Sequence, residues 1–333
     1  MKHINVALFV PDEGCPHRCS FCNQKTISGK SKPLTVEDIE KAVETAVSTS
    51  DCGEGEIAFF GGSFTAIERS YMLSLLKKGK EYVDKGLFKG IRISTRPDCI
   101  DAEILTLLKE NGVTSIELGC QSMDDEVLSL NERGHSSSDV VKAAALIKEY
   151  GFEFGVQMMT GLYGDTREKA VETAEKLISL RPDTARIYPT VVLENTRLAE
   201  LYEKGEYIPQ TTDEAADLCA ELLLMFYEAD IRVIRLGLHS GGNVEEGFVA
   251  GAYHPAFREL AESRIYLRKI KEEIEKENIP KGKTEITVGS KYISMASGQK
   301  RSNINALSAL GYEVKITGNS DYKKYEVSVR LTQ

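Results

Sequence analysis

The chain has 333 residues, of which 41 % are hydrophobic, and this is enough for the core of one large domain with a small appendage. No apolar run approaches the roughly 20 residues that span a bilayer, and the N-terminus lacks the apolar segment of a signal peptide, so we expect neither a membrane protein nor a secreted one. The odd count of seven cysteines argues against a disulfide framework and favours a reducing cytoplasm. A net charge of −9 gives the whole chain no general attraction to nucleic acid.

Three cysteines follow the first predicted strand, residues 6–10, on the loop that leaves its carboxyl end. Cys15, Cys19 and Cys22 have the spacing C-x3-C-x2-C, so their thiolates can converge on one metal centre. Three ligands are one short of a structural zinc site and one short of the usual four-cysteine set of a [4Fe–4S] cluster. Two interpretations follow: a cluster with one iron open to a non-protein ligand, or a zinc knuckle completed by His17 or a distant cysteine. The other cysteines have no metal-ligand spacing and are predicted to pack as small hydrophobes: Cys52, Cys99, Cys120 and Cys219.

Apolar strands and amphipathic helices alternate along the chain as far as Gly242. Strands are predicted at residues 6–10, 56–60, 90–95, 113–119, 152–159, 183–188 and 232–238. Helices are predicted at residues 35–49, 67–83, 100–111, 138–150, 167–180 and 213–229, with Thr35 and Asp101 as N-caps. This alternation predicts a parallel sheet with right-handed crossovers, which a doubly wound sheet or a barrel would satisfy. In both architectures the reactive groups lie at the carboxyl ends of the strands.

A different pattern follows Gly242. A helix rich in charged residues is predicted at 255–278, and then a small strand–helix–strand–strand module with elements at 284–289, 299–310, 312–316 and 325–331. From Lys281 to Gln333, nine Lys or Arg accompany four Asp or Glu, so this segment carries +5 and the rest of the chain −14. We therefore predict a core at 1–255, a connecting helix at 256–280 and a small basic α+β module at 281–333.

Several motifs resemble the radical S-adenosylmethionine (SAM) superfamily, in particular the radical SAM half of elongator subunit 3 and oxygen-independent coproporphyrinogen oxidase-like proteins. They lie at residues 15–22, 61–63, 95–98, 117–122 and 131–135. The resemblance implies an α/β fold, a partial (β/α)6 TIM-like barrel. It also implies a [4Fe–4S] cluster on Cys15, Cys19 and Cys22, with SAM bound at the open iron. Reductive cleavage of SAM there would give a 5′-deoxyadenosyl radical.

The resemblance assigns roles to residues near the first three strands. Phe21 stands where the family has an aromatic residue before the third cysteine. Gly61, Gly62 and Ser63 correspond to the family's GGE-type motif, whose backbone binds the amino group of the methionine moiety. Ser94 stands where the coproporphyrinogen oxidase type has a ribose-binding Glu, and this departure puts the ribose contact in question.

Further roles are implied for residues of the later strands. Gln121, Arg133 and Gln157 align with positions that contact SAM, and the guanidinium fork of Arg133 suits a carboxylate. Tyr188 and His239 follow the sixth and seventh predicted strands, where we expect them to face the substrate or adenosine, or to relay a proton or radical.

The predicted substrate is an RNA base, in tRNA in particular, because of the elongator-like subgroup and the basic module. Lys281, Lys283, Lys300 and Arg301 are the residues expected to contact phosphates. An electron donor such as ferredoxin or flavodoxin is the second implied partner. Two alternatives stay open: a radical reaction on a small molecule of the coproporphyrinogen type, and a non-catalytic Fe–S or zinc protein that binds RNA or a partner. The resemblance does not extend to the acetyltransferase domain of elongator subunit 3 proteins, so their full reaction is not expected.

Overall fold

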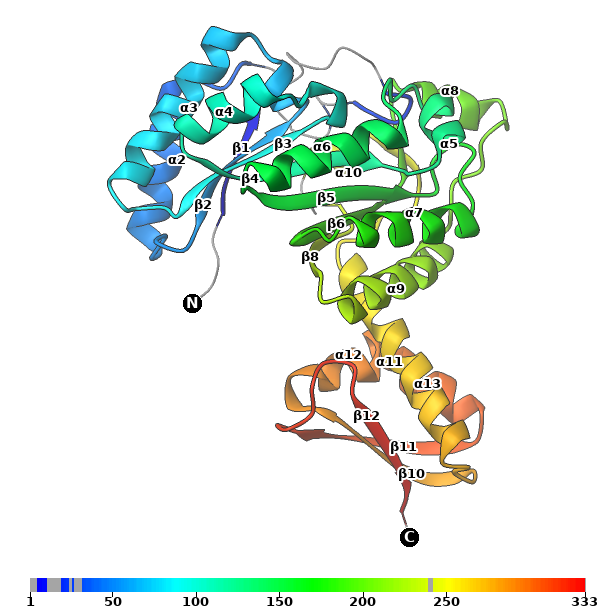
Figure 1. The fold of residues 1–333 in the computed structure, drawn as a ribbon. Coiled ribbons are helices and arrows are strands. Elements are labelled where there is room, and N and C mark those ends of the chain that lie inside the picture. Colours follow the sequence, from blue (N-terminus) through cyan, green and yellow to red (C-terminus); the bar gives the residue numbers. More distant parts are fainter. Residues whose placement is uncertain (1–4, 11–18, 24–25, 27–31, 239–241, 333) are drawn as a thin grey trace.

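The computed structural model describes residues 5–10, 19–23, 26, 32–238 and 242–332, and its largest feature is a curled sheet of seven parallel strands (Figure 1). In spatial order the strands are β1 (Asn5–Val10), β2 (Glu56–Gly61), β3 (Gly90–Thr95), β4 (Val113–Gln121), β5 (Glu153–Thr160), β6 (Thr184–Pro189) and β8 (Arg232–Leu236). Among the described residues the two edge strands, β1 and β8, do not pair with each other. The sheet is therefore a half-barrel, which confirms the predicted partial barrel with β8 as a seventh strand.

Helices cover the convex face of the sheet: α2 (Val36–Thr49), α3 (Arg69–Asp84), α4 (Ala102–Glu110), α6 (Ser137–Glu149), α7 (Arg167–Ser179) and α9 (Thr212–Glu228). The predicted N-caps are confirmed, because Thr35 forms a capping box with Asp38 and the Asp101 carboxylate accepts a hydrogen bond from the Ile104 N–H at 2.8 Å. The η1 (Phe64–Ala66) and η2 (Pro97–Cys99) turns and the short helix α5 (Asp125–Leu130) lie in the connections. None of the described helices has the length and apolar composition that a membrane span requires.

Four short elements between β6 and the long helix that follows β8 were not predicted. They are the strands β7 (Val191–Leu193) and β9 (Phe248–Gly251), which pair antiparallel, and the helices α8 (Arg197–Glu203) and α10 (Gly242–Glu246). Val192, Leu198 and Tyr207 form a second, smaller apolar cluster there. Each element is too short to leave a hydrophobic period in the sequence, so only this tertiary packing fixes it.

The helix α11 (Phe257–Lys276) leads from the sheet edge at β8 to a small module (Figure 1). The module contains β10 (Gly282–Gly289), η3 (Ser290–Tyr292), α12 (Ile293–Ser297), η4 (Gln299–Arg301), α13 (Ser302–Ala309), β11 (Tyr312–Asn319) and β12 (Val327–Leu331). Its sheet has the order β11-β10-β12, with β10 parallel to β11 and antiparallel to β12. The small α+β module is thus confirmed, while the division of the chain at 255 and 280 stays a prediction.

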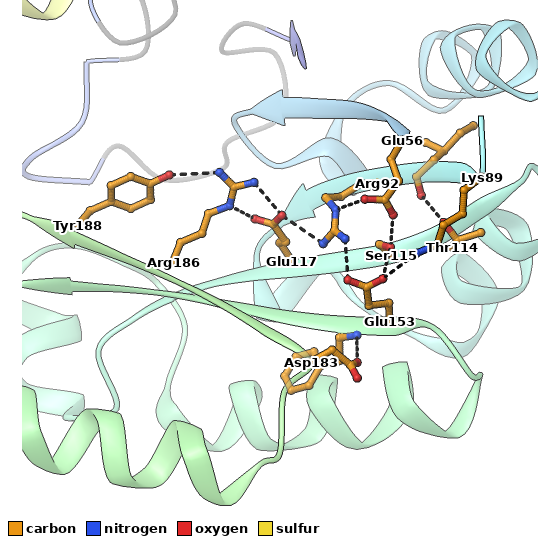
Figure 2. Close-up of polar contacts among 12 residues, drawn as sticks. Glu56, Lys89, Arg92, Thr114, Ser115, Glu117, Glu153, Asp183, Arg186 and Tyr188 are labelled. Carbon is orange, nitrogen blue, oxygen red and sulfur yellow. Dashed lines mark hydrogen bonds and ion pairs between the residues drawn. The ribbon is translucent and has the colours of Figure 1, made fainter. Parts of the chain in front are cut away.

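The concave face of the large sheet carries charged side chains from four neighbouring strands (Figure 2). Arg92 on β3, which is only 1 % exposed, donates through Nε to Glu56 at 2.7 Å, through Nη1 to Glu117 at 3.3 Å and through Nη2 to Glu153 at 2.7 Å. These carboxylates come from β2, β4 and β5. One guanidinium therefore ties four strands together on the inside of the half-barrel.

A second guanidinium approaches Glu117 from β6. Arg186 donates through Nε and Nη2 to the Glu117 carboxylate at 2.5 and 3.0 Å, and it lies 4.8 Å from the ring centroid of Phe60. Burial opposes the charge on Arg186, but the Glu117 carboxylate and the Tyr188 hydroxyl together outweigh it and raise the pKa of Arg186. Gly155 leaves the room for Glu117, since a Cβ there would lie 2.8 Å from Glu117 Cγ. We name Glu56, Arg92, Glu117, Glu153 and Arg186 the concave-face ion network.

Replacing Arg92 by Met should lower the apparent free energy of unfolding by about 3–5 kcal/mol, because buried carboxylates would lose their shared cation. Urea unfolding followed by circular dichroism measures this. Arg69→Met is the matched control, since it removes an exposed pair with Glu103 worth under about 1 kcal/mol. Equal losses in the two variants would contradict a structural role for the network.

Candidate cofactor site

The second and third cysteines of the predicted triad lie in one tight turn, in which the Cys22 N–H donates to the Cys19 carbonyl at 3.1 Å. Cys19 is buried, and Phe21 packs against the small apolar cluster of Val192, Leu198 and Tyr207. Cys15, like His17, lies outside the described residues. Two of the three predicted metal ligands are therefore placed close together.

Hydrogen bonds on two sides hold this turn in place. The Ser20 N–H donates to the Asn131 carbonyl at 3.1 Å, and the Ser20 hydroxyl donates to Asn131 Oδ1 at 2.7 Å. On the other side, the Leu198 N–H at the start of α8 donates to the Ser20 carbonyl at 2.8 Å. Ser20 and Asn131 are both fully buried, so the turn is fixed between the end of α5 and the start of α8.

Arg133 brings a buried guanidinium to the same turn. Its Nη1 lies 3.0 Å from Cys19 Sγ, and its Nη2 donates to the Gly119 carbonyl at 2.6 Å. Arg96, which forms an ion pair with Asp98, donates to the carbonyl of Arg133 and so fixes the backbone there. A buried cation therefore lies at the sulfur atom of a predicted metal ligand.

Three buried nitrogen atoms around this turn have no hydrogen-bond partner among the described residues: Arg96 Nη1, Arg133 Nε and His135 Nδ1. Burial, together with the guanidinium groups of Arg133 and Arg96, lowers the pKa of His135 to about 4, so its imidazole is neutral near pH 7. The two guanidinium groups present buried donors, which are costly unless a ligand completes them, whereas His135 Nδ1 is an acceptor because Nε2 donates to the Cys120 carbonyl at 3.2 Å. Thiolate donors, adjacent guanidinium groups and unpartnered nitrogens together suit an iron–sulfur cluster with a carboxylate-bearing ligand.

The predicted SAM-contacting residues of β3, β4 and β5 lie near the carboxyl ends of these strands. Alternation along the strands places Ser94 and Gln157 on the same side as Glu117, and both are half-buried. Gln121 follows a bulge in β4, has a φ of +66° and accepts a hydrogen bond from Gln157 Nε2 at 3.2 Å. The structure therefore brings these amides together on the concave face, closer to the carboxyl ends of the strands than the concave-face ion network is. Their contact with SAM stays a prediction.

The Gly61-Gly62-Ser63 segment lies where β2 ends beside β1. Gly61 has a φ of +130°, and a Cβ there would lie 2.1 Å from the Val10 carbonyl oxygen, so only glycine fits. Ser63 differs from its two neighbours, because its buried hydroxyl bonds to Thr95 Oγ1 at 2.9 Å and accepts from the Arg96 N–H at 3.3 Å. The Ser63 side chain is therefore used inside the protein, and any ligand contact of this segment falls to its backbone.

Of the two residues predicted to face the substrate, the structure describes Tyr188. Tyr188 is half-buried on the concave face, and its hydroxyl accepts from Arg186 Nη1 at 3.4 Å (Figure 2). His239 lies outside the described residues. The roles of both stay predictions.

Sequence reasoning did not find the concave-face ion network or the clamp of Asn131 on Ser20. A signal for the network was present, because β2 to β6 each carry at least one charged residue in an otherwise apolar strand. A charge in such a strand predicts a partner on a neighbouring strand. The Asn131 clamp joins residues 111 positions apart and left no local pattern.

Comparison with known proteins gives the chain a family. A family model described as the Radical SAM superfamily matches residues 10–177, and one described as the Radical_SAM C-terminal domain matches residues 182–268. An uncharacterized protein of Methanocaldococcus jannaschii is 34 % identical over 214 residues, which are 60 % of this chain and 65 % of that protein. A tRNA uridine(34) acetyltransferase of Methanocaldococcus infernus is 32 % identical over 184 residues, 49 % of this chain and 34 % of that protein.

A solved structure agrees in fold. Methanocaldococcus infernus Elp3 with an N-terminal deletion superposes with a TM-score of 0.60 and 21 % identity, over 88 % of this chain and 68 % of that chain. At this identity the likeness concerns the fold alone. The chain spans about one quarter to two thirds of the length of the curated relatives it matches.

Replacing Gly61 by Ala should lower both thermal stability and the iron bound per chain. The new Cβ would push on the carbonyl at the end of β1, which leads into the cysteine segment, and the backbone strain alone costs about 1–3 kcal/mol. Iron and sulfide content after anaerobic reconstitution, with the melting temperature, measures this. Gly53→Ala is the control, because its Cβ would meet only Asp51 Oδ1 at 3.4 Å. Normal iron content in Gly61→Ala would refute the link between this close approach and the cysteine segment.

Proposed function

The chain belongs to the radical SAM superfamily, and from this premise we propose that it modifies a base of RNA, in tRNA in particular. As a member of that superfamily it is an enzyme, and its cofactors are a [4Fe–4S] cluster and SAM. When bound, these cofactors supply a carbon-centred radical that abstracts a hydrogen atom. The protein's own residues bind and orient the cofactors and exclude water.

We infer that Cys15, Cys19 and Cys22 hold the cluster. The observation that carries this proposal is the contact of the buried Arg133 guanidinium with Cys19 Sγ at 3.0 Å. In this position Arg133 offsets part of the negative charge that thiolate ligands bring into a buried site. Its unpartnered Nε leaves one donor for the carboxylate of SAM, so the predicted carboxylate contact and the observed sulfur contact are compatible.

The remaining SAM contacts are proposed along the rim of the half-barrel. Backbone groups at Gly61 and Gly62 bind the amino group, and the paired amides of Gln121 and Gln157 supply donors and acceptors for the polar parts of SAM. Ser94 lies on the same concave face with a half-buried hydroxyl that suits the ribose. Phe21 and Ser63 support this arrangement through packing and internal hydrogen bonds.

We propose that Tyr188 and His239 face the substrate. The Tyr188 hydroxyl accepts a hydrogen bond from Arg186, whose charge is held by Glu117, so the ion network fixes the direction of the phenol. A phenol fixed in this way can orient a polar edge of a base. His239 is proposed from its sequence position alone.

Two observations support RNA as the substrate. Relatives named as tRNA uridine(34) acetyltransferases match about half of the chain, and the module carries a charge of +5. Lys281 and Lys283 lie at the start of β10, and Lys300 and Arg301 precede α13, with all four exposed. These cations can contact a backbone of phosphates. An electron donor such as ferredoxin or flavodoxin is proposed as the second partner.

Anaerobic reconstitution with iron and sulfide, followed by SAM and dithionite, should give 5′-deoxyadenosine with the wild type. The Cys15→Ala/Cys19→Ala/Cys22→Ala variant should give none, because no thiolates remain to hold the cluster. Chromatography of the nucleoside measures this, and Cys52→Ala is the control with a cysteine removed elsewhere. A cluster-loaded wild type that binds SAM, yet forms no 5′-deoxyadenosine even with RNA present, would count against the proposal.

Replacing Lys281, Lys283, Lys300 and Arg301 by Gln should weaken RNA binding and make it less dependent on salt. Each lost phosphate contact lowers the slope of log affinity against log salt by about 0.7 for a single strand. Filter binding of tRNA at several salt concentrations measures the slope. The control variant replaces four exposed lysines of the barrel helices by Gln, with the same change in net charge: Lys41, Lys77, Lys85 and Lys142. Equal slopes in the two variants would exclude the module as the RNA contact.

A further inference from the structure

A cavity of about 480 Å³ lies at the open edge of the half-barrel, between β8, the first turn of α11 and the C-terminal module. We name it the edge cavity. Its cationic lining comes from three elements: Arg235 on β8, Arg258 on α11 and Lys324 in the module. Figure 1 shows how α11 leads from this edge of the sheet to the module, so the cavity lies where the two meet.

Two of the three cations share one carboxylate. Glu262 is 2 % exposed and accepts from Arg258 Nε at 3.0 Å and from Lys324 Nζ at 2.8 Å. The second carboxylate of the lining, Glu259, is exposed. The buried pairing therefore leaves an excess of positive charge at the wall of the cavity.

Arg235 has no carboxylate within ion-pair distance among the described residues. Its Nε donates to the Gly237 carbonyl at 2.9 Å. Burial, together with the nearby guanidinium groups of Arg186 and Arg258, lowers the pKa of Arg235, whereas Arg186 has its pKa raised by Glu117. Arg235 stands opposite Arg186 in the register of β6 and β8, so it extends the row of concave-face charges to the sheet edge. Within the described part of the chain, the row ends on a cation that no carboxylate neutralises.

The backbone of the cavity wall also favours an anion. The first turn of α11, a helix of 20 residues, lines the cavity. His254 accepts from the Ala256 N–H through Nδ1 and from the Phe257 N–H through its carbonyl, both at 3.1 Å, so among the described residues the uncapped N–H groups of this turn are those of Arg258 and Glu259. Uncapped N–H groups at a helix N-terminus attract negative charge, and phosphate in particular. Arginine is the side chain whose planar fork matches the oxygens of a phosphate.

We propose that the edge cavity binds a phosphate group through Arg235, Arg258 and the first turn of α11. The identity of the phosphate rests on the function proposed above: it is a backbone phosphate of the RNA strand whose base enters the concave face. Binding there places the strand across the junction of half-barrel and module, beside Tyr188. The edge cavity is separate from the cysteine turn and from the exposed cations of the module.

Inorganic phosphate tests the site itself. At constant ionic strength, phosphate should raise the melting temperature of the wild type and of Arg232→Gln, and it should lose most of this effect on Arg235→Gln. Arg232 is the matched control because it is an exposed arginine of the same strand. Arg235→Lys, which keeps the charge, should keep part of the effect. The same response in wild type and Arg235→Gln, or none in the wild type, would overturn the phosphate site.

RNA binding tests whether the phosphate in the edge cavity belongs to RNA. Arg235→Gln should weaken RNA binding about tenfold and reduce the salt slope by about 0.7, whereas Arg232→Gln should leave both unchanged. If RNA binds wild type and Arg235→Gln equally, the RNA phosphate is not in the cavity, although the RNA function stands. If the wild type responds to phosphate but binds no RNA, the phosphate site stands and the proposed RNA function fails.

Discussion

The carboxylate of Glu117 is shared by Arg92 and Arg186, and the architecture of the inner half-barrel depends on this sharing. An open barrel exposes part of its concave face to a ligand, so that face cannot be filled by apolar side chains alone. Charges buried beneath it must be paired, since an unpaired buried ion is far more costly than a paired one. Gly155 is part of the same constraint, because any side chain there would collide with Glu117.

This pairing divides the concave face into two layers. In the layer farther from the carboxyl ends of the strands, which we call the lower layer, the guanidinium groups and carboxylates neutralise one another and fix the register of β2 to β6. In the upper layer, nearer the carboxyl ends, Gln121, Gln157 and Tyr188 carry uncharged polar groups with hydrogen-bonding capacity to spare, which is the surface that a polar ligand needs. The lower layer keeps its charge away from the ligand and holds the upper layer in position. If SAM binds there as proposed, it would meet directed hydrogen-bonding groups rather than a field of free charges.

The regular elements could be predicted from the sequence because they are local: an apolar run, an amphipathic period or a cap such as Thr35 or Asp101 lies within a few residues. The cysteine triad could be predicted for the same reason. The contact of Arg133 with Cys19 could not, since it joins residues 114 positions apart. The bulge that turns Gln121 and the short pair β7 and β9 depend on register and on tertiary packing, which no local pattern records.

Arg235, at one end of the row of concave-face charges, differs in its ion pairing from Arg92 and Arg186 in the middle of the row. Arg92 and Arg186 have carboxylates on neighbouring strands. Arg235 lies on the last strand of the sheet, and the residues that the structure describes form no further strand beyond β8 to supply one. A closed barrel would have satisfied it from the next strand. In a half-barrel the unpaired cation falls at the open edge, where α11 and the module complete the wall. The opening of the half-barrel thus leaves a positive charge at its border, and this charge would favour the phosphate-bearing substrate proposed above.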